Sequence, residues 1–74
     1  MKFINITRLS DKEEISVNVN SIIMIELYSI EEMNSGGYME FVNYTKLTLQ
    51  FIGELIIQEN MDYVKKLIGE NNFN

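Results

Sequence analysis

Alternating polar and apolar residues predict two β-strands in the first part of the chain. Residues 2–9 carry β-branched and aromatic side chains between polar ones, and residues 14–19 alternate strictly. Residues 10–13 between them have the polar composition of a turn. We therefore expect an antiparallel hairpin. A corner or single helical turn should follow over residues 18–21, because Asn and Ser favour hydrogen bonds to their own backbone.

The next predicted strand, residues 21–30, is apolar on both of its faces. Successive side chains of a strand point to opposite sides of the sheet. One face would carry Ile23, Ile25 and Leu27, and the other Ile22, Met24, Tyr28 and Ile30. A strand of this kind requires cover on both sides, which predicts a central position in the sheet or a subunit interface.

The strongest loop signal of the chain is Asn-Ser-Gly-Gly at residues 34–37. Residues 38–44 could pair back onto residues 28–33 across this turn and form a long protruding hairpin. The alternative is a mobile loop over residues 31–44, and the sequence leaves both open.

Two further strands are predicted on either side of a turn at Gly53. Residues 45–51 alternate, with Leu47, Leu49 and Phe51 on the apolar face, and residues 55–58 form the last strand.

At Asn60 the hydrophobic period changes to that of an amphipathic helix. Asn60 is a favourable N-cap, and Gly69 suits the left-handed position after a helix. Asp62 in the first turn and Lys65 and Lys66 in the last complement the helix dipole. The apolar stripe consists of Met61, Val64, Leu67 and Ile68.

These elements predict an α+β fold that is mainly β. We expect a small antiparallel sheet of five to six strands with one C-terminal helix packed on it, forming a single β-rich domain over residues 1–74. Residues 70–74 read as a frayed polar tail.

Composition adds an expectation about assembly. A single core in a chain of 74 residues rarely supplies more than about 3–5 kcal/mol, and the absence of Cys and His removes disulfides and structural zinc as additional support. Oligomerisation remains, so we expect a homo-oligomer. The N-terminus lacks a secretory h-region and no apolar run reaches the length of a membrane span, which predicts a cytoplasmic protein without membrane partners.

Charge and residue types argue against nucleic-acid binding and catalysis. The net charge is −5 and no segment concentrates basic residues, so a nucleic-acid polymer is not an expected partner. Without His or Cys, only carboxylates such as those at residues 11–14 and 31–32 could act as acid or base, and these read as solvated turns. Glycine-rich phosphate loops and calcium-loop spacing are absent. We expect no enzyme activity, metal or cofactor.

Recognition is therefore the remaining candidate function. Tyr and Met are favoured at interfaces, and they gather in and beside the predicted hairpin. The candidate interface residues are Ile22, Met24, Tyr28, Ile30, Met39 and Phe41, and the candidate ligand-binding residues are Arg8, Tyr28, Tyr38, Asn43 and Tyr44. The competing interpretations are that the aromatic residues pack the monomer's own second face and that Arg8 forms a surface ion pair.

Several short segments give the chain a resemblance to a known family. They are Ile6-Thr7-Arg8-Leu9 with Glu14, residues 18–22 with Ile25 and Glu26, residues 45–49 with Gly53, residues 56–60, and Tyr63, Val64, Leu67 and Ile68. In this arrangement the chain resembles the small FlbD-like family, best known from bacterial flagellar operons, with similar short proteins in phages and Bacteroidetes.

This chain departs from the family pattern at three places. Gly53 is displaced by about one position, Asn60 replaces the usual Ser cap, and residues 31–44 look like an insertion. The resemblance implies an intracellular, non-enzymatic accessory protein, linked in flagellar examples to motility, with no catalytic residues to transfer.

Three functional hypotheses follow. The first is a non-enzymatic binding module that forms a homo-oligomer through residues 22–30 and 38–44. The second is a phage-type sponge protein that sequesters a small or cyclic nucleotide signal, with Tyr rings stacking on the base and Arg8 at a phosphate. The third is an inhibitor or motility accessory that docks one host protein by strand addition or through its acidic face.

Overall fold

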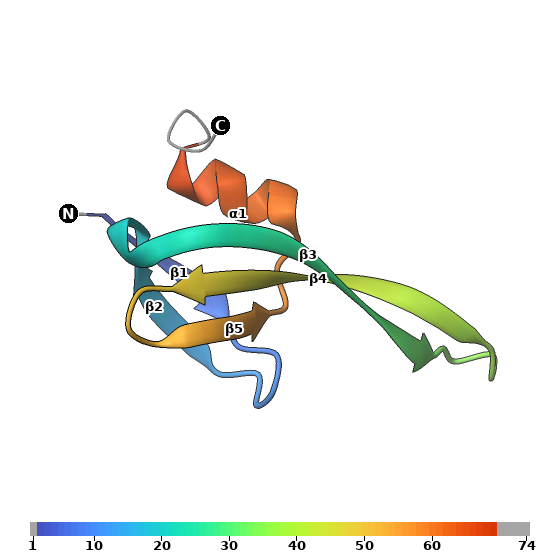
Figure 1. Ribbon diagram of the computed structural model, residues 1–74. Coiled ribbons are helices and arrows are strands. Elements are labelled where there is room, and N and C mark those ends of the chain that lie inside the picture. The colour runs from blue at the N-terminus through green and yellow to red at the C-terminus, as the bar shows by residue number, and fades with distance from the viewer. Residues whose placement is uncertain (1, 70–74) are drawn as a thin grey trace.

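The computed structural model describes residues 2–69 of the chain, so the predicted tail at residues 70–74 lies outside the described part. These residues form five strands, one short 3-10 turn and one helix, arranged as in Figure 1. In chain order the elements are β1 (Phe3–Thr7), β2 (Glu14–Asn18), η1 (Val19–Ser21), β3 (Ile22–Met33), β4 (Met39–Leu49), β5 (Gly53–Ile57) and α1 (Met61–Ile68). The mainly β class with one C-terminal helix is confirmed.

The strands form two antiparallel sheets, so the prediction of one sheet of five to six strands is wrong. β1 pairs with β2, and β3, β4 and β5 form a second sheet in that order. Among residues 2–69 one isolated bridge, Arg8 with Ile57, joins the sheets, flanked by backbone hydrogen bonds from Leu9 to Ile56 (3.0 Å) and from Gln58 to Thr7 (2.9 Å). Pairing stops there because β1 enters its turn while β5 leaves toward the helix.

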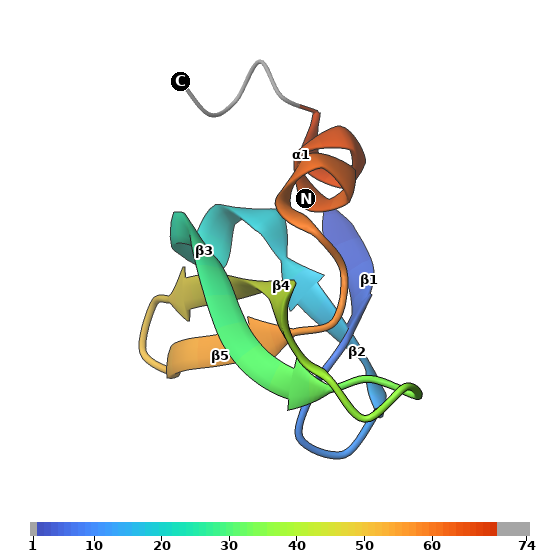
Figure 2. The same cartoon turned by 90° about the vertical axis from the view of Figure 1, so that its right-hand side faces the viewer.

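The core lies between the two sheets and the helix. The buried apolar side chains among residues 2–69 are Ile4, Ile6, Val17, Val19, Ile22, Leu47, Leu49, Ile57, Val64 and Ile68. Figure 2 shows α1 lying above the strands, near β1 and β3. Val64 and Ile68 from the predicted helix stripe belong to the core cluster, and both are almost completely buried.

Both ends of α1 and the corner before β3 are where the sequence predicts them. The Asn60 side chain accepts a hydrogen bond from the Tyr63 amide (2.8 Å), and Gly69 adopts φ 88° and donates to the Lys65 carbonyl (3.0 Å). At the corner, the Asn18 side chain accepts from the Asn20 amide (2.9 Å). Local side-chain chemistry therefore determines these three positions.

β3 differs from its predicted pattern in two respects. A bulge between Ile22 and Met24 breaks the strict alternation, so Ile22 is buried in the core while Met24 is 46% exposed. The expectation that these two residues share a face is wrong. β3 also lies at the edge of its sheet instead of in a central position.

Phe51 is also placed differently from the prediction. β4 ends at Leu49, and Phe51 lies in the following turn with φ 70° and 98% exposure instead of on the apolar face with Leu47 and Leu49. Gly53 begins β5 with φ 97°, a conformation that glycine adopts without strain.

The predicted long hairpin is confirmed and the mobile-loop alternative is wrong. β3 and β4 pair without interruption from Met24 with Thr48 to Met33 with Met39, and Figure 1 shows their distal half projecting away from the core. The Asn34 side chain accepts from the amides of Gly36 (2.9 Å) and Tyr38 (3.0 Å), which closes the turn at the tip.

Replacing Thr45 tests whether its side-chain hydrogen bond stabilises the core face of β4. Its hydroxyl is fully buried and donates to the Glu59 carbonyl (2.6 Å), so Thr45→Val leaves that carbonyl without its donor. We expect a loss of about 1–3 kcal/mol in the free energy of unfolding, measured by urea denaturation at one protein concentration. Thr48→Val, on the opposite face of the same strand, is the control and should change stability by less than about 0.5 kcal/mol. Equal losses in both variants would contradict this role of the hydroxyl.

Candidate functional site

One face of the projecting hairpin is apolar and exposed. Residues directly opposite each other across an antiparallel pair share a face, and the register pairs Leu27 with Thr45, Glu31 with Phe41 and Met33 with Met39. In the core this face is buried at Thr45 and Leu47. Farther out it remains exposed, by 59% at Leu27, 74% at Phe41, 68% at Met33 and 52% at Met39. We call Leu27, Met33, Met39 and Phe41 the hairpin patch.

The opposite face of the hairpin is better packed. Tyr28 pairs with Tyr44 and Ile30 with Val42, and these side chains cover one another across the strands. The Tyr44 hydroxyl donates to the Glu32 carboxylate (2.9 Å), and this hydrogen bond together with burial raises the pKa of Tyr44 above its usual value. The face is therefore an ordered surface with polar groups already bonded to each other.

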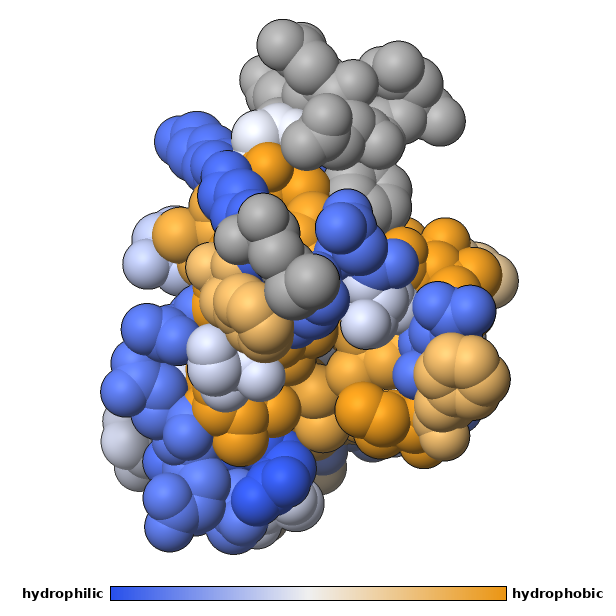
Figure 3. Space-filling model, turned by 90° about the vertical axis from the view of Figure 1, so that its left-hand side faces the viewer, coloured by the Kyte–Doolittle hydropathy of each residue, from blue (hydrophilic) through white to orange (hydrophobic). Residues whose placement is uncertain are grey.

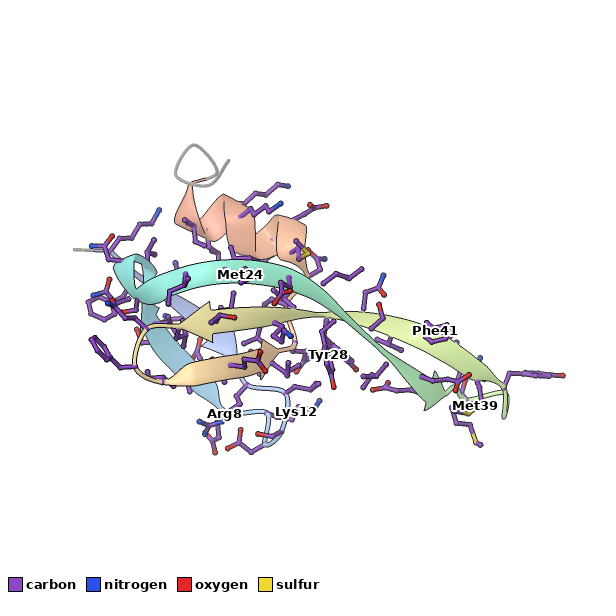
Figure 4. The ribbon with its side chains drawn as sticks, viewed as in Figure 1. Arg8, Lys12, Met24, Tyr28, Met39 and Phe41 are labelled. Carbon is purple, nitrogen blue, oxygen red and sulfur yellow. The ribbon has the colours of Figure 1, made fainter. Side chains whose placement is uncertain are left out.

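A cleft of about 430 Å³ lies between this second face and the β1–β2 turn. Its lining residues are Arg8, Leu9, Ser10, Tyr28, Ile30, Glu54, Leu55 and Ile56. In Figure 4, Tyr28 lies on the side of the hairpin that faces the turn carrying Arg8. Most of the walls are apolar, with Arg8, Ser10 and Glu54 as the polar groups.

The guanidinium of Arg8 is already engaged at the mouth of this cleft. Its Nε and Nη2 donate to the two carboxylate oxygens of Asp11 at 3.0 and 2.7 Å. The hydrogen bonds from Arg8 hold the pKa of Asp11 below its usual value. Arg8 therefore forms a surface ion pair, which was the competing interpretation from the sequence, and an anionic ligand would have to displace Asp11.

The five candidate ligand-binding residues do not gather in one place. Arg8 and Tyr28 line the cleft, whereas Tyr38 is 74% exposed at the hairpin tip. Asn43 accepts from the Ser29 hydroxyl (2.7 Å) on the face of the hairpin patch, and Tyr44 is bonded to Glu32. Only part of the predicted set could contact a single small ligand.

The six candidate interface residues fall into three groups. Ile22 is a core residue, and Met24 is exposed near the start of β3. Tyr28 and Ile30 line the cleft, while Met39 and Phe41 belong to the hairpin patch. Figure 4 shows Met39 and Phe41 on the projecting part of the ribbon.

Sequence reasoning missed Leu27 and Met33 as members of the exposed apolar face. The register across the turn determines that they share a face with Phe41 and Met39. The signal for Met33 was present in the sequence, because pairing across residues 34–37 places it opposite Met39.

A second group of exposed apolar residues lies at the end away from the hairpin. Figure 3 views this end and shows apolar surface beside polar regions. The exposed apolar residues of β1, the start of β3 and the β4–β5 turn are Phe3, Ile23, Met24, Phe51 and Ile52. Phe51 and Ile52 follow one another in a turn, whereas the hairpin patch repeats along a regular strand pair.

Charge further distinguishes the hairpin from the rest of the chain. Residues 13–45 contain no Lys or Arg, while Glu31, Glu32 and Glu40 lie on the hairpin. Near the core, Lys46 lies 3.5 Å from both Glu26 and Glu54, and these carboxylates raise its pKa. The projecting part is thus apolar on one face and acidic overall.

Residues 2–69 contain no group of three or more His, Cys, Asp or Glu side chains placed to hold a metal ion. The described helix is too short to cross a membrane.

The comparisons with known proteins give no relative for this chain. No family model, curated protein or solved structure matches it.

The raised pKa of Tyr44 gives a prediction for the second face of the hairpin. Because its folded-state pKa lies above the usual value of 10.0, the bond to Glu32 stabilises the fold below that pH, and this stability is lost as pH rises through the folded pKa. Glu32→Gln should therefore lower the pKa of one of the four tyrosines in an absorbance titration of tyrosinate. Glu40→Gln, on the same face, is the control. An unchanged titration in Glu32→Gln would rule out the bond.

Proposed function

We propose that this protein is a non-enzymatic binding module that acts in the cytoplasm as a homo-oligomer, with the hairpin patch as its contact surface. The observation that carries the proposal is the exposure of four large apolar side chains on one face of a regular projecting hairpin. Large exposed apolar side chains on one face are typical of interaction sites, and here they share that face with Glu31 and the hydrogen-bonded pair Ser29 and Asn43.

The outer part of the hairpin would be stabilised by contact with a partner. A two-stranded ribbon is marginally stable in water by itself, and stability normally requires a third strand or a packed face. The distal part of the hairpin has neither among residues 2–69, because β5 pairs only with Thr45 to Leu49 of β4. Full burial of one Leu, Met or Phe side chain is worth roughly 1.5–3 kcal/mol, so the hairpin patch supplies a driving force for association.

A second copy of the chain is the partner that we propose. The chain is small and has no Cys or His for internal crosslinks, which favours stabilisation by assembly. The resemblance to the FlbD-like family implies a non-enzymatic role, and the outer part of the hairpin contains residues 31–44, which look like an insertion relative to that family.

The test is the effect of Met33→Ser on assembly. The wild-type protein should be oligomeric by size-exclusion chromatography with light scattering at high micromolar concentration. Loss of two Met33 side chains from a symmetric dimer should weaken association about a hundredfold. Phe51→Ser, which removes an even more exposed apolar side chain outside the hairpin, should leave the oligomer intact. A monomeric wild-type protein would disprove homo-oligomerisation and leave docking to one host protein as the hypothesis for the hairpin.

Nucleotide sequestration remains a second candidate because the cleft brings Arg8 and Tyr28 together. If it occurs, a cyclic nucleotide or ADP-ribose derivative should raise the melting temperature, since such a ligand binds only the folded state. Tyr28→Ala should abolish the shift, while Tyr38→Ala, outside the cleft, should retain it. Absence of a shift at millimolar ligand concentration would exclude this function.

A further inference from the structure

The outer edge of β3 carries a stretch without a neighbouring strand. Among residues 2–69, β3 is the outer strand of its sheet, and α1 contacts it. Thr45, the partner of Leu27, donates to the Glu59 carbonyl, so the rung of Leu27 and Thr45 lies where the connection from β5 to α1 meets the strand pair. From this rung to Met33, where β3 ends, no described strand pairs with the outer edge of β3. The free edge, as we define it, is residues 27–33.

The backbone groups of the free edge alternate in direction. The Asn34 amide donates to the Tyr38 carbonyl, so the even-numbered residues of this stretch face β4. The N–H and C=O groups of Leu27, Ser29, Glu31 and Met33 therefore point outward, toward a possible additional strand. The stretch contains no Pro, Lys or Gly, and its pairing with β4 has no bulge, so the usual devices that block strand addition are largely missing.

The sequence of the free edge is compatible with antiparallel pairing to itself. In a two-fold symmetric antiparallel pair, one residue must lie opposite its own copy. If all of residues 27–33 pair, this residue is Ile30, the middle of the stretch. Leu27 then lies opposite Met33, Tyr28 opposite Glu32 and Ser29 opposite Glu31. No glutamate faces a glutamate in this register. Centring on Glu31 would place that residue opposite itself, and centring on Ser29 would place Glu26 opposite Glu32.

We propose that two copies of this chain pair antiparallel through residues 27–33 of β3, with Ile30 on the two-fold axis. This inference rests on the proposed homo-oligomer and specifies its geometry. The two hairpins become one four-stranded sheet, which removes the marginal stability of the isolated ribbon. Leu27 of each copy lies beside Met33 of the other, so these two members of the hairpin patch form the apolar contact, while Met39 and Phe41 on β4 lie outside it.

The pairing also adds polar complementarity on the opposite face. Glu32 already accepts a hydrogen bond from Tyr44, and a carboxylate has acceptor capacity for a second donor. Tyr28 of the second copy lies opposite Glu32 in this register and can supply its hydroxyl. Glu32, on a strand that contains no Lys or Arg, therefore gains a second hydrogen-bond donor from the second copy.

A cysteine placed at Ile30 tests the register. The natural sequence has no Cys, so each variant carries a single thiol. Opposed Ile30 residues form a non-hydrogen-bonded pair, whose Cα atoms lie about 4.5 Å apart, within the range for a disulfide. Ile30→Cys should form a disulfide-linked dimer under mild oxidation. Ser29→Cys should not, because its copies lie about 8 Å apart in the same register.

A proline at Glu31 tests the backbone pairing. The Glu31 amide points away from β4, so Glu31→Pro retains the monomer's own ladder but removes an outward donor. We expect loss of the dimer with unchanged far-ultraviolet circular dichroism. Glu31→Ala, which keeps the amide, should remain dimeric.

The outcomes distinguish this inference from the function on which it rests. An oligomeric wild-type protein in which Ile30→Cys does not crosslink, or crosslinks no better than Ser29→Cys, overturns the edge pairing and leaves the homo-oligomer in place. An oligomer that survives Glu31→Pro overturns it as well. A monomeric wild-type protein removes both proposals.

Discussion

The pairing of β3 with β4 is the interaction on which the rest of the structure depends. The inner half of β4 places Thr45, Leu47 and Leu49 in the core, where they pack against both sheets and the helix. The outer half of the same strand carries Phe41 and Met39 into solvent. The strand pair is continuous, so its inner half is anchored in the core and its outer half is held by the same ladder of backbone hydrogen bonds. The outer half has no core of its own and depends on this anchor.

This continuity explains why the hairpin patch exists. A strand pair keeps the same residues on the same face along its length, so the face that is buried at Leu47 is the face exposed at Phe41. The difference between the two halves is only the cover supplied by α1 and the first hairpin. The exposed apolar face is therefore an extension of the core surface beyond the elements that cover it.

The negative charge of the hairpin restricts which surfaces can cover it. The chain has no cation between residues 13 and 45, so the glutamates of the hairpin are not neutralised along their own strands. Arg8 is held by Asp11 and Lys46 lies between Glu26 and Glu54. Any partner that covers the hairpin must either keep its own carboxylates out of register with these glutamates or bring positive charge.

Local sequence chemistry alone determined much of the secondary structure. The Asn60 and Gly69 caps, the corner at Asn18 and the turn at residues 34–37 depend on hydrogen bonds within a few residues, and each was predictable for that reason. The candidate site was predicted less completely: Met39 and Phe41 were identified, whereas Leu27 and Met33 were not. The division into two sheets, the bulge after Ile22 and the exposure of Phe51 depend on where β1, β5 and α1 meet. Only the tertiary structure decided these features, because contacts between distant segments determine which part of an alternating strand is covered and which part remains exposed.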